Sequence, residues 1–108
     1  DRNGKLVLVV GSGGGSRIIN YVAKALVAVL ALKLDAQQAV SLPNFSNRNG
    51  ATELEEGTSF AELKQSLERL GHTVEVVRLT SGSQAIMAID RGLVGGADPR
   101  REGLAKGE

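Results

Sequence analysis

Residues 11–16 carry the pattern with the clearest chemical meaning in this 108-residue chain. They read Gly-Ser-Gly-Gly-Gly-Ser, so four of the five positions from Gly11 to Gly15 are glycine. Glycine has no Cβ, which allows successive backbone N–H groups to converge on one point. Donors fixed in this way stabilise the negative oxygen of a tetrahedral acyl-transfer intermediate. We call residues 11–16 the glycine loop and predict an anion site there, with an oxyanion hole as one candidate.

Two other interpretations of the glycine loop are open at this point. It is also explained as a tight turn that needs glycine for steric reasons alone. In addition, Gly11-x-Gly13-x-x-Ser16 is close to the dinucleotide pattern, which places a pyrophosphate at a helix N-terminus. That pattern requires a second parallel strand and an acidic residue about 20 positions further on, for which Asp35 is the candidate. Asp35 is better explained as the N-cap of a short helix, so we expect no nicotinamide or flavin cofactor.

The sequence on either side of the loop predicts the elements that position it. A strand over residues 5–10 precedes the loop, and its continuous apolar run predicts burial on both faces. A helix follows with Ser16 as N-cap and apolar residues at helical spacing from Ile18 to Val29. Further elements are predicted as helices over 36–41 and 60–70, an extended piece at 53–55, and strands over 73–79, 83–90 and 93–97. This order indicates an α+β fold, an antiparallel sheet with helices on one face.

Composition excludes several classes of protein. Thirteen basic and twelve acidic residues give a net charge of +1, and no basic stripe is present, which argues against a nucleic-acid-binding protein. The absence of cysteine excludes disulfides and thiolate zinc sites. Glu53, Glu55 and Glu56 form an acidic run whose spacing fits no standard metal-ligand set, so we expect a solvated face and no metal.

The most apolar stretch, Ile18–Leu32, has 15 residues and contains Lys24. It is too short for a membrane span, which requires about 20 apolar residues. A helix that is apolar on nearly all sides needs burial on nearly all sides, which a single 108-residue domain provides with difficulty. We therefore expect this chain to be part of a larger assembly, or to self-associate when isolated.

A few polar residues outside the loop are candidates for chemistry, and each has a simpler structural explanation. His72 lies at a predicted helix-to-strand turn and is expected on the surface. Residues 80–83 (Thr-Ser-Gly-Ser) lack the pattern of a nucleophile elbow and are interpreted as a strand connection. Asp98 and Arg100 are expected to form an ion pair that holds the C-terminal tail. Arg17 needs a carboxylate partner because a cation is unfavourable at a helix N-terminus, and Asp98 is a candidate.

Residues 11–19 (GSGGGSRII) resemble the G-S/T-P-G-G-S-R-I-I segment of γ-glutamyltranspeptidases. Five further segments resemble motifs of the same family in the same order, and together the matches extend from about Lys5 to Gly103. They are LPNF at 42–45, TELEEG at 52–57, LGH at 70–72, GSQAI at 82–86 and GGADPR at 95–100.

The resemblance implies an N-terminal-nucleophile (Ntn) hydrolase with a four-layer αββα sandwich. Such an enzyme cleaves its precursor into a large and a small subunit. The new N-terminal Thr of the small subunit then attacks the γ-glutamyl amide of glutathione or a related compound. The acyl-enzyme passes to water or to an acceptor amine. The family needs no cofactor, and the resemblance implies a periplasmic or secreted location.

The resemblance places the oxyanion hole at the backbone N–H groups of Gly14 and Gly15, with Ser12 as a further substrate contact. Gly13 stands where the family has proline, which would have stiffened the loop. The nucleophile is expected upstream of Asp1, so residues 1–108 are interpreted as the C-terminal segment of a small subunit without an internal boundary. The expected partners are a γ-glutamyl small molecule, the large subunit and the remainder of the small subunit. The chain alone is predicted to be inactive.

Two alternatives to this function are kept. One is a cephalosporin-acylase-like amidase of the same superfamily, because the substrate pocket would lie mostly outside this chain. The other is a non-catalytic anion-binding or scaffold domain derived from the enzyme.

Overall fold

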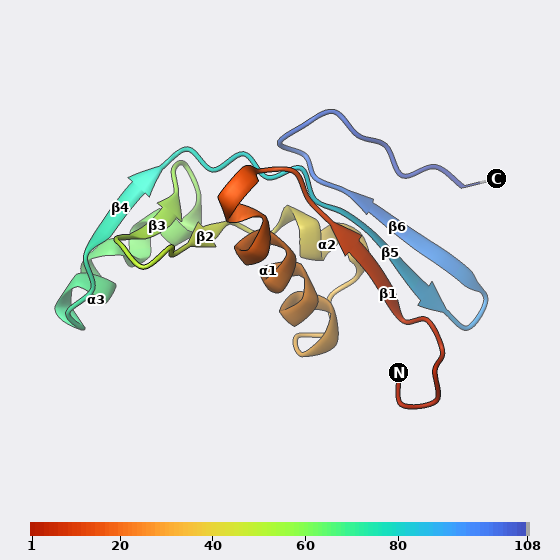
Figure 1. The fold of residues 1–108 in the computed structure, drawn as a ribbon. Helices are drawn as coiled ribbons and strands as arrows, with labels where there is room; N and C mark the ends of the chain where they lie inside the picture. Colours follow the sequence, from red (N-terminus) through yellow and green to blue (C-terminus); the bar gives the residue numbers. More distant parts are fainter. Residues whose placement is uncertain (108) are drawn as a thin grey trace.

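Two three-stranded sheets and a set of short helices make up the fold, and the computed structural model describes residues 1–107. The molecule is elongated, and the two sheets lie toward its opposite ends (Figure 1). In chain order the strands and helices are β1 (Leu8–Gly11), α1 (Ile18–Leu30), α2 (Ala36–Ser41), β2 (Phe45–Ser46), β3 (Thr52–Glu55), α3 (Lys64–Arg69), β4 (Val74–Val77), β5 (Gln84–Ile89) and β6 (Gly92–Ala97). Short 3₁₀ turns at Gly15–Arg17 (η1) and Ser59–Leu63 (η2) precede α1 and α3.

The larger sheet has the order β1-β5-β6 and is antiparallel throughout. A tight hairpin joins β5 to β6, which fall within or beside the strands predicted over 83–90 and 93–97, and Gly92 takes a φ of 145° at the turn. Val10 and Ala85 are cross-strand partners, and both belong to the apolar cluster that packs against α2. The helices α1 and α2 cover this face, and the C-terminal tail runs along the other (Figure 1). The predicted α+β arrangement with helices on one face of an antiparallel sheet is therefore confirmed.

Helix α2 approaches β6 closely because Gly96 has no side chain. A Cβ at Gly96 would lie 2.5 Å from the carbonyl carbon of Ala36 and 2.7 Å from the backbone nitrogen of Gln37. The neighbouring Gly95 points to the opposite face, where a Cβ would meet the Cβ of Ala105 in the C-terminal tail at 2.8 Å. Gly96 thus sets the separation between the helix layer and the sheet.

We expect Gly96→Ala to destabilise the chain by about 1–3 kcal/mol, because the helix backbone must move to admit the methyl group. Gly95→Ala is the matched control, since it adds the same atom but displaces only the tail. Urea unfolding followed by circular dichroism measures both. Equal stability of the two variants would contradict the close packing of α2 on β6.

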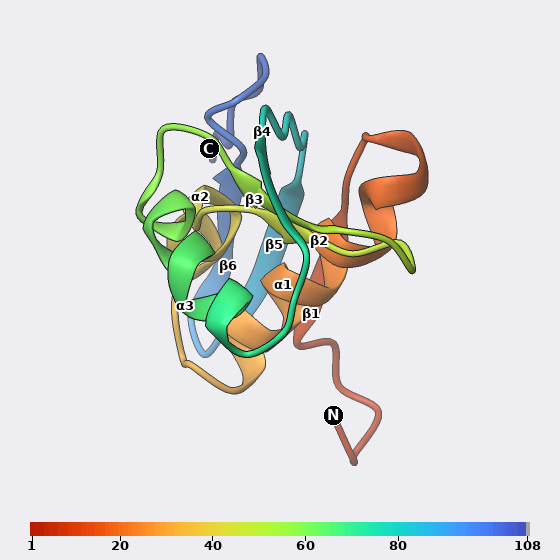
Figure 2. The same cartoon turned by 90° about the vertical axis from the view of Figure 1, so that its left-hand side faces the viewer.

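Of the smaller sheet, β2-β3-β4, the sequence predicted β3 as an extended piece at residues 53–55 and β4 as a strand over residues 73–79, but it did not predict β2. Strand β2 pairs antiparallel with β3, and β3 pairs parallel with β4 across the η2–α3 connection. Figure 2 shows this sheet with α3 beside it. A two-residue strand such as β2 has too few residues to produce an alternating pattern, which is why the sequence does not reveal it.

The face of the larger sheet opposite the helices is largely open. Val9, Ile86 and Leu93 on this face are 52%, 46% and 68% exposed. Within residues 1–107 the tail alone lies over it, through Leu104 and Ala105. The prediction that the first strand is buried on both faces is therefore wrong for this chain.

Helix α1 forms at the predicted position and leaves its outer side uncovered, as expected for an apolar helix in so short a chain, but its predicted N-cap is wrong. Its inner side buries Tyr21, Ala25 and Val29, whereas Ile19 on the outer side is 79% exposed. Ser16 does not cap α1, because it lies inside the preceding 3₁₀ turn, where its Oγ accepts a hydrogen bond from Arg48. Among the helices of the described residues, none combines the length and apolar character needed to cross a membrane.

Candidate functional site

The glycine loop joins β1 to α1 and places two adjacent glycines in conformations that L side chains rarely adopt. Gly14 has a φ of 135° and Gly15 a φ of 60°. The carbonyl of Gly14 accepts from the N–H of Arg17, which closes η1. Within residues 1–107 neither the N–H of Gly14 nor that of Gly15 donates a hydrogen bond to another part of the chain. Two adjacent backbone donors are thus available to an external acceptor.

Tyr21 on α1 lies under the glycine loop, and its ring limits how closely the loop can approach the helix. The Tyr21 side chain is almost fully buried, and a Cβ at Gly14 would lie only 2.7 Å from its Cε2 atom. Burial raises the pKa of the Tyr21 hydroxyl above its ordinary value, and Arg17 partly opposes this. The loop therefore needs glycine at position 14 both for backbone conformation and for space.

An ion-pair cluster holds the loop against the smaller sheet. Arg17 forms a bidentate pair with Glu53 on β3, with both N···O distances at 2.7 Å. Arg48 donates to the same carboxylate at 3.0 Å and to Ser16 Oγ at 2.9 Å. The hydrogen bond from Arg17, which outweighs the effect of burial, and that from Arg48 lower the pKa of Glu53 to about 2. The proposed partner of Arg17, Asp98, was therefore wrong: the partner is Glu53.

We expect Glu53→Gln to lower stability at neutral pH by about 1–2 kcal/mol, because it removes the charge from these hydrogen bonds. The pKa of Glu53 is lower in the folded state, so its contribution is present above its ordinary pKa near 4.5 and is lost as the pH falls toward about 2. The variant should accordingly show a shallower acid loss of stability across that window. Glu56→Gln, at an exposed neighbouring position, is the control. Identical pH profiles for all three proteins would rule out this role for Glu53.

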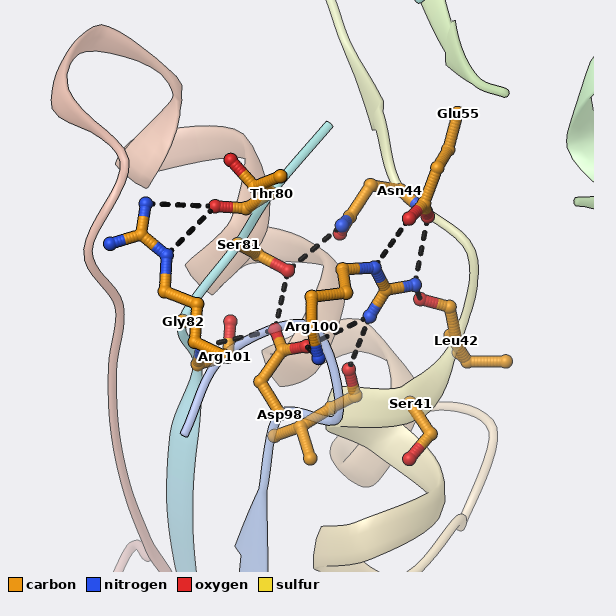
Figure 3. A network of polar contacts seen from close by, with 12 residues as sticks. Ser41, Leu42, Asn44, Glu55, Thr80, Ser81, Gly82, Asp98, Arg100 and Arg101 are labelled. Carbon is orange, nitrogen blue, oxygen red and sulfur yellow. Dashed lines mark hydrogen bonds and ion pairs between the residues drawn. The ribbon is translucent and has the colours of Figure 1, made fainter. Parts of the chain in front are cut away.

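A second, buried network joins the segments around Asn44, Glu55, Ser81 and Asp98 (Figure 3). The Asp98 carboxylate, 1% exposed, accepts from Ser81 Oγ, from the N–H of Ser83 at 3.1 Å, and from Arg100 through both its N–H and Nη1 at 3.0 Å. Arg100 also forms a bidentate pair with Glu55 on β3. The predicted Asp98–Arg100 pair that holds the C-terminal tail is present.

The same network continues through Asn44 to Lys24. The Asn44 side chain donates to Ser81 Oγ at 2.8 Å and accepts from Lys24 Nζ at 2.8 Å. Lys24 Nζ also donates to the carbonyl of Leu42 at 2.7 Å. Burial, followed by repulsion from Arg100, lowers the pKa of Lys24 to about 8. Buried side-chain polar atoms of the described residues all have a hydrogen-bond partner.

Burial and hydrogen bonding shift the pKa values of Asp98 and Arg100 in opposite directions. Burial raises the pKa of Asp98, but hydrogen bonds led by that from Ser81 outweigh it, so the pKa lies below its ordinary value. Burial lowers the pKa of Arg100, and its hydrogen bonds to Glu55 and Asp98 reverse this. Both groups are therefore charged at neutral pH, as a paired buried cluster requires.

Several sequence-based predictions can be judged against this geometry. His72 is exposed at its turn, as expected, and residues 80–83 connect β4 to β5. The prediction of a solvated acidic face was wrong. Glu53 and Glu55 are buried in ion pairs, and of the three glutamates in this run only Glu56 is exposed. Sequence reasoning also missed the burial of Ser81 and Ser83, for which the hydroxyl-rich stretch before a strand was the one available signal.

The dinucleotide interpretation does not fit the fold. Strand β1 pairs antiparallel with β5, so the required parallel neighbour is missing from the sheet formed by residues 8–97. Asp35 instead caps α2 in a complete capping box with Gln38. No cluster of three or more potential metal-ligating side chains occurs among residues 1–107.

Comparison with known proteins identifies the family of the chain. The sequence profile of gamma-glutamyltranspeptidase matches residues 1–108. The glutathione hydrolase proenzyme of Escherichia coli K12 is 37% identical over 102 residues, which cover 92% of this chain and 17% of that protein. The chain therefore spans about a sixth of the length of this relative.

Solved structures show the same fold. A Helicobacter pylori gamma-glutamyltranspeptidase is 31% identical with a TM-score of 0.82, over 92% of this chain and 56% of the other. A cephalosporin acylase from Bacillus halodurans is 26% identical with a TM-score of 0.78, over 92% of this chain and 20% of the other. The α+β layers described above are thus those of Ntn hydrolases. With a family match over its whole length, this chain belongs to the γ-glutamyltranspeptidase family.

Proposed function

We propose that this chain supplies the oxyanion-hole loop of a γ-glutamyltransferase that also acts as a glutathione hydrolase. In this proposal the N–H groups of Gly14 and Gly15 receive the carbonyl oxygen of the γ-glutamyl amide. The observation that carries the proposal is a pair of adjacent N–H groups that have no acceptor among residues 1–107, in the strand–loop–helix of a family member. Ser12 belongs to the proposed site as part of the same loop, although its hydroxyl is occupied by contacts within the chain.

The chemistry follows from the position of the charge. A nucleophilic Thr hydroxyl attacks the γ-glutamyl carbonyl, and the carbonyl oxygen becomes negative in the tetrahedral intermediate. Two fixed N–H donors stabilise this oxygen more than the neutral carbonyl, and this difference lowers the barrier. Collapse of the intermediate expels the amine, and water or an acceptor amine then takes the acyl group from the enzyme.

The remaining parts of the enzyme are proposed partners. We propose that residues 1–108 form the C-terminal segment of a small subunit, without an internal boundary. The remainder of that subunit provides the Thr nucleophile, and the large subunit completes the site for the γ-glutamyl substrate. The exposed apolar residues of α1 and of the open sheet face support such partners, because monomeric proteins rarely leave large apolar patches uncovered.

Release of p-nitroaniline from γ-glutamyl-p-nitroanilide tests the proposal. The complete enzyme that contains this chain should release it, whereas the 108-residue chain alone should not. Release by the chain alone would disprove the assignment of the nucleophile to another segment. No release by the complete enzyme would leave a non-catalytic anion-binding or scaffold domain as the better description.

A cephalosporin-acylase-like amidase is the second candidate, favoured by the similarity to the Bacillus halodurans acylase. The complete enzyme would then hydrolyse the acyl side chain of a cephalosporin in preference to the γ-glutamyl anilide. Measured kcat/KM for the two substrates separates the candidates, since a pocket built for the γ-glutamyl α-amino group rejects an acyl chain that lacks it.

A further inference from the structure

The hydroxyl of Ser12 is fully used inside the chain. It donates to the carbonyl of Gly13 at 2.8 Å and accepts from the N–H of Gly82 at 3.3 Å and from Ser83 Oγ at 3.2 Å. A serine hydroxyl has one hydrogen to donate and two lone pairs that accept. Ser12 therefore ties the glycine loop to residues 82–83, which are 70 positions away in sequence.

Ser83 is held on both sides of its own backbone. Its N–H donates to the buried carboxylate of Asp98 at 3.1 Å, and its carbonyl accepts from the N–H of Asp98 at 2.9 Å. Ser83 is completely buried, so its hydroxyl has few orientations and points at Ser12. The buried network thus ends in one hydroxyl that contacts the glycine loop.

We propose that Ser83 is a positioning residue for the oxyanion hole, acting through Ser12. A loop rich in glycine has a large conformational freedom, and an oxyanion hole works only if its donors are fixed before the charge develops. The contact of Ser83 with Ser12 removes part of that freedom two residues before Gly14. This inference rests on the proposed function, because it concerns the N–H groups of Gly14 and Gly15.

The test is a double-mutant cycle in the complete enzyme with γ-glutamyl-p-nitroanilide as substrate. Ser83→Ala should lower kcat about tenfold, as expected for one hydrogen bond, with KM changed less than about twofold. Ser12→Ala should lower kcat at least as much, because it also removes the hydrogen bonds to Gly13 and Gly82. The double variant should be no slower than Ser12→Ala, because Ser12→Ala already removes the contact that Ser83→Ala removes.

Ser81→Ala is the matched control. Ser81 lies two residues before Ser83 and donates to the same Asp98 carboxylate, but its hydroxyl contacts Asn44 instead of Ser12. This variant should be less stable while keeping a kcat close to that of the wild type. An equal loss of kcat in Ser81→Ala, or additive losses in the double variant, would overturn the proposal. A raised KM at unchanged kcat would also overturn it.

A second measurement separates failure of this inference from failure of the proposed function. If the wild-type enzyme releases no p-nitroaniline, the proposed function fails. Backbone ¹⁵N relaxation at Gly14 and Gly15 still reports on the mobility of the loop in wild type and in both variants, because it does not require a hydrogen-bonded amide. The inference requires lower order parameters at both amides in Ser83→Ala and unchanged order parameters in Ser81→Ala. Equal order parameters in all three proteins would overturn the inference whatever the activity.

Discussion

Replacement of Asp98 by alanine is expected to destabilise the chain by about 3–5 kcal/mol. The substitution takes the acceptor from Ser81 Oγ and from the N–H of Ser83, both of which are buried. It also leaves two cations, the partly buried Arg100 and the buried Lys24, with the single carboxylate of Glu55. Unpaired buried charge is the most costly consequence, because the interior does not replace the lost hydration.

Urea unfolding of the chain, followed by circular dichroism, measures this effect. Asp90→Ala is the control, since Asp90 lies exposed at the β5–β6 turn and should change stability by less than about 0.5 kcal/mol. Asp98→Asn should fall between the two, because the amide keeps the shape and one acceptor oxygen but loses the charge. A stability of Asp98→Ala within error of Asp90→Ala would show that the network does not hold the C-terminal tail.

The local features of this fold were predictable from sequence because their causes lie within a few residues. The capping box at Asp35 involves a partner three positions on, and the β5–β6 hairpin needs a glycine where φ is positive. The glycine loop is likewise recognisable from its amino-acid composition. For such features the sequence pattern and the structure describe the same short-range interactions.

The ion pairs behind the loop were not predictable in this way. Arg17 meets Glu53 across 36 residues, and Arg100 meets Glu55 across 45. An acidic run gives the same local sequence pattern whether its carboxylates are solvated or paired with arginine. The sequence therefore could not reveal that the prediction of a solvated face was wrong. The exposure of the open sheet face was not predictable for a similar reason. Whether a strand face is covered depends on other surfaces, which the sequence pattern of a single strand does not describe.

Gly14→Ala is expected to lower kcat of the complete enzyme by about 10²–10³-fold, the usual cost of losing an oxyanion-hole donor. Two causes act together. The backbone φ of 135° is unfavourable for alanine, and the methyl group would lie 2.7 Å from Cε2 of the buried Tyr21 ring. The strain can be relieved by a change in φ or by a shift of the loop away from α1. Each of these moves the two N–H groups that must point at one oxygen.

Two further variants make this expectation specific. Gly15→Ala meets no atom within 4 Å and has a φ of 60°, which alanine adopts at a cost of about 1–2 kcal/mol, so its kcat should fall less than that of Gly14→Ala. Gly50→Ala, also without a neighbour within 4 Å, lies outside the glycine loop and should keep the wild-type kcat. Unfolding curves recorded in parallel show whether each protein is folded. A folded Gly14→Ala enzyme with wild-type kcat would exclude the Gly14 N–H from the oxyanion hole.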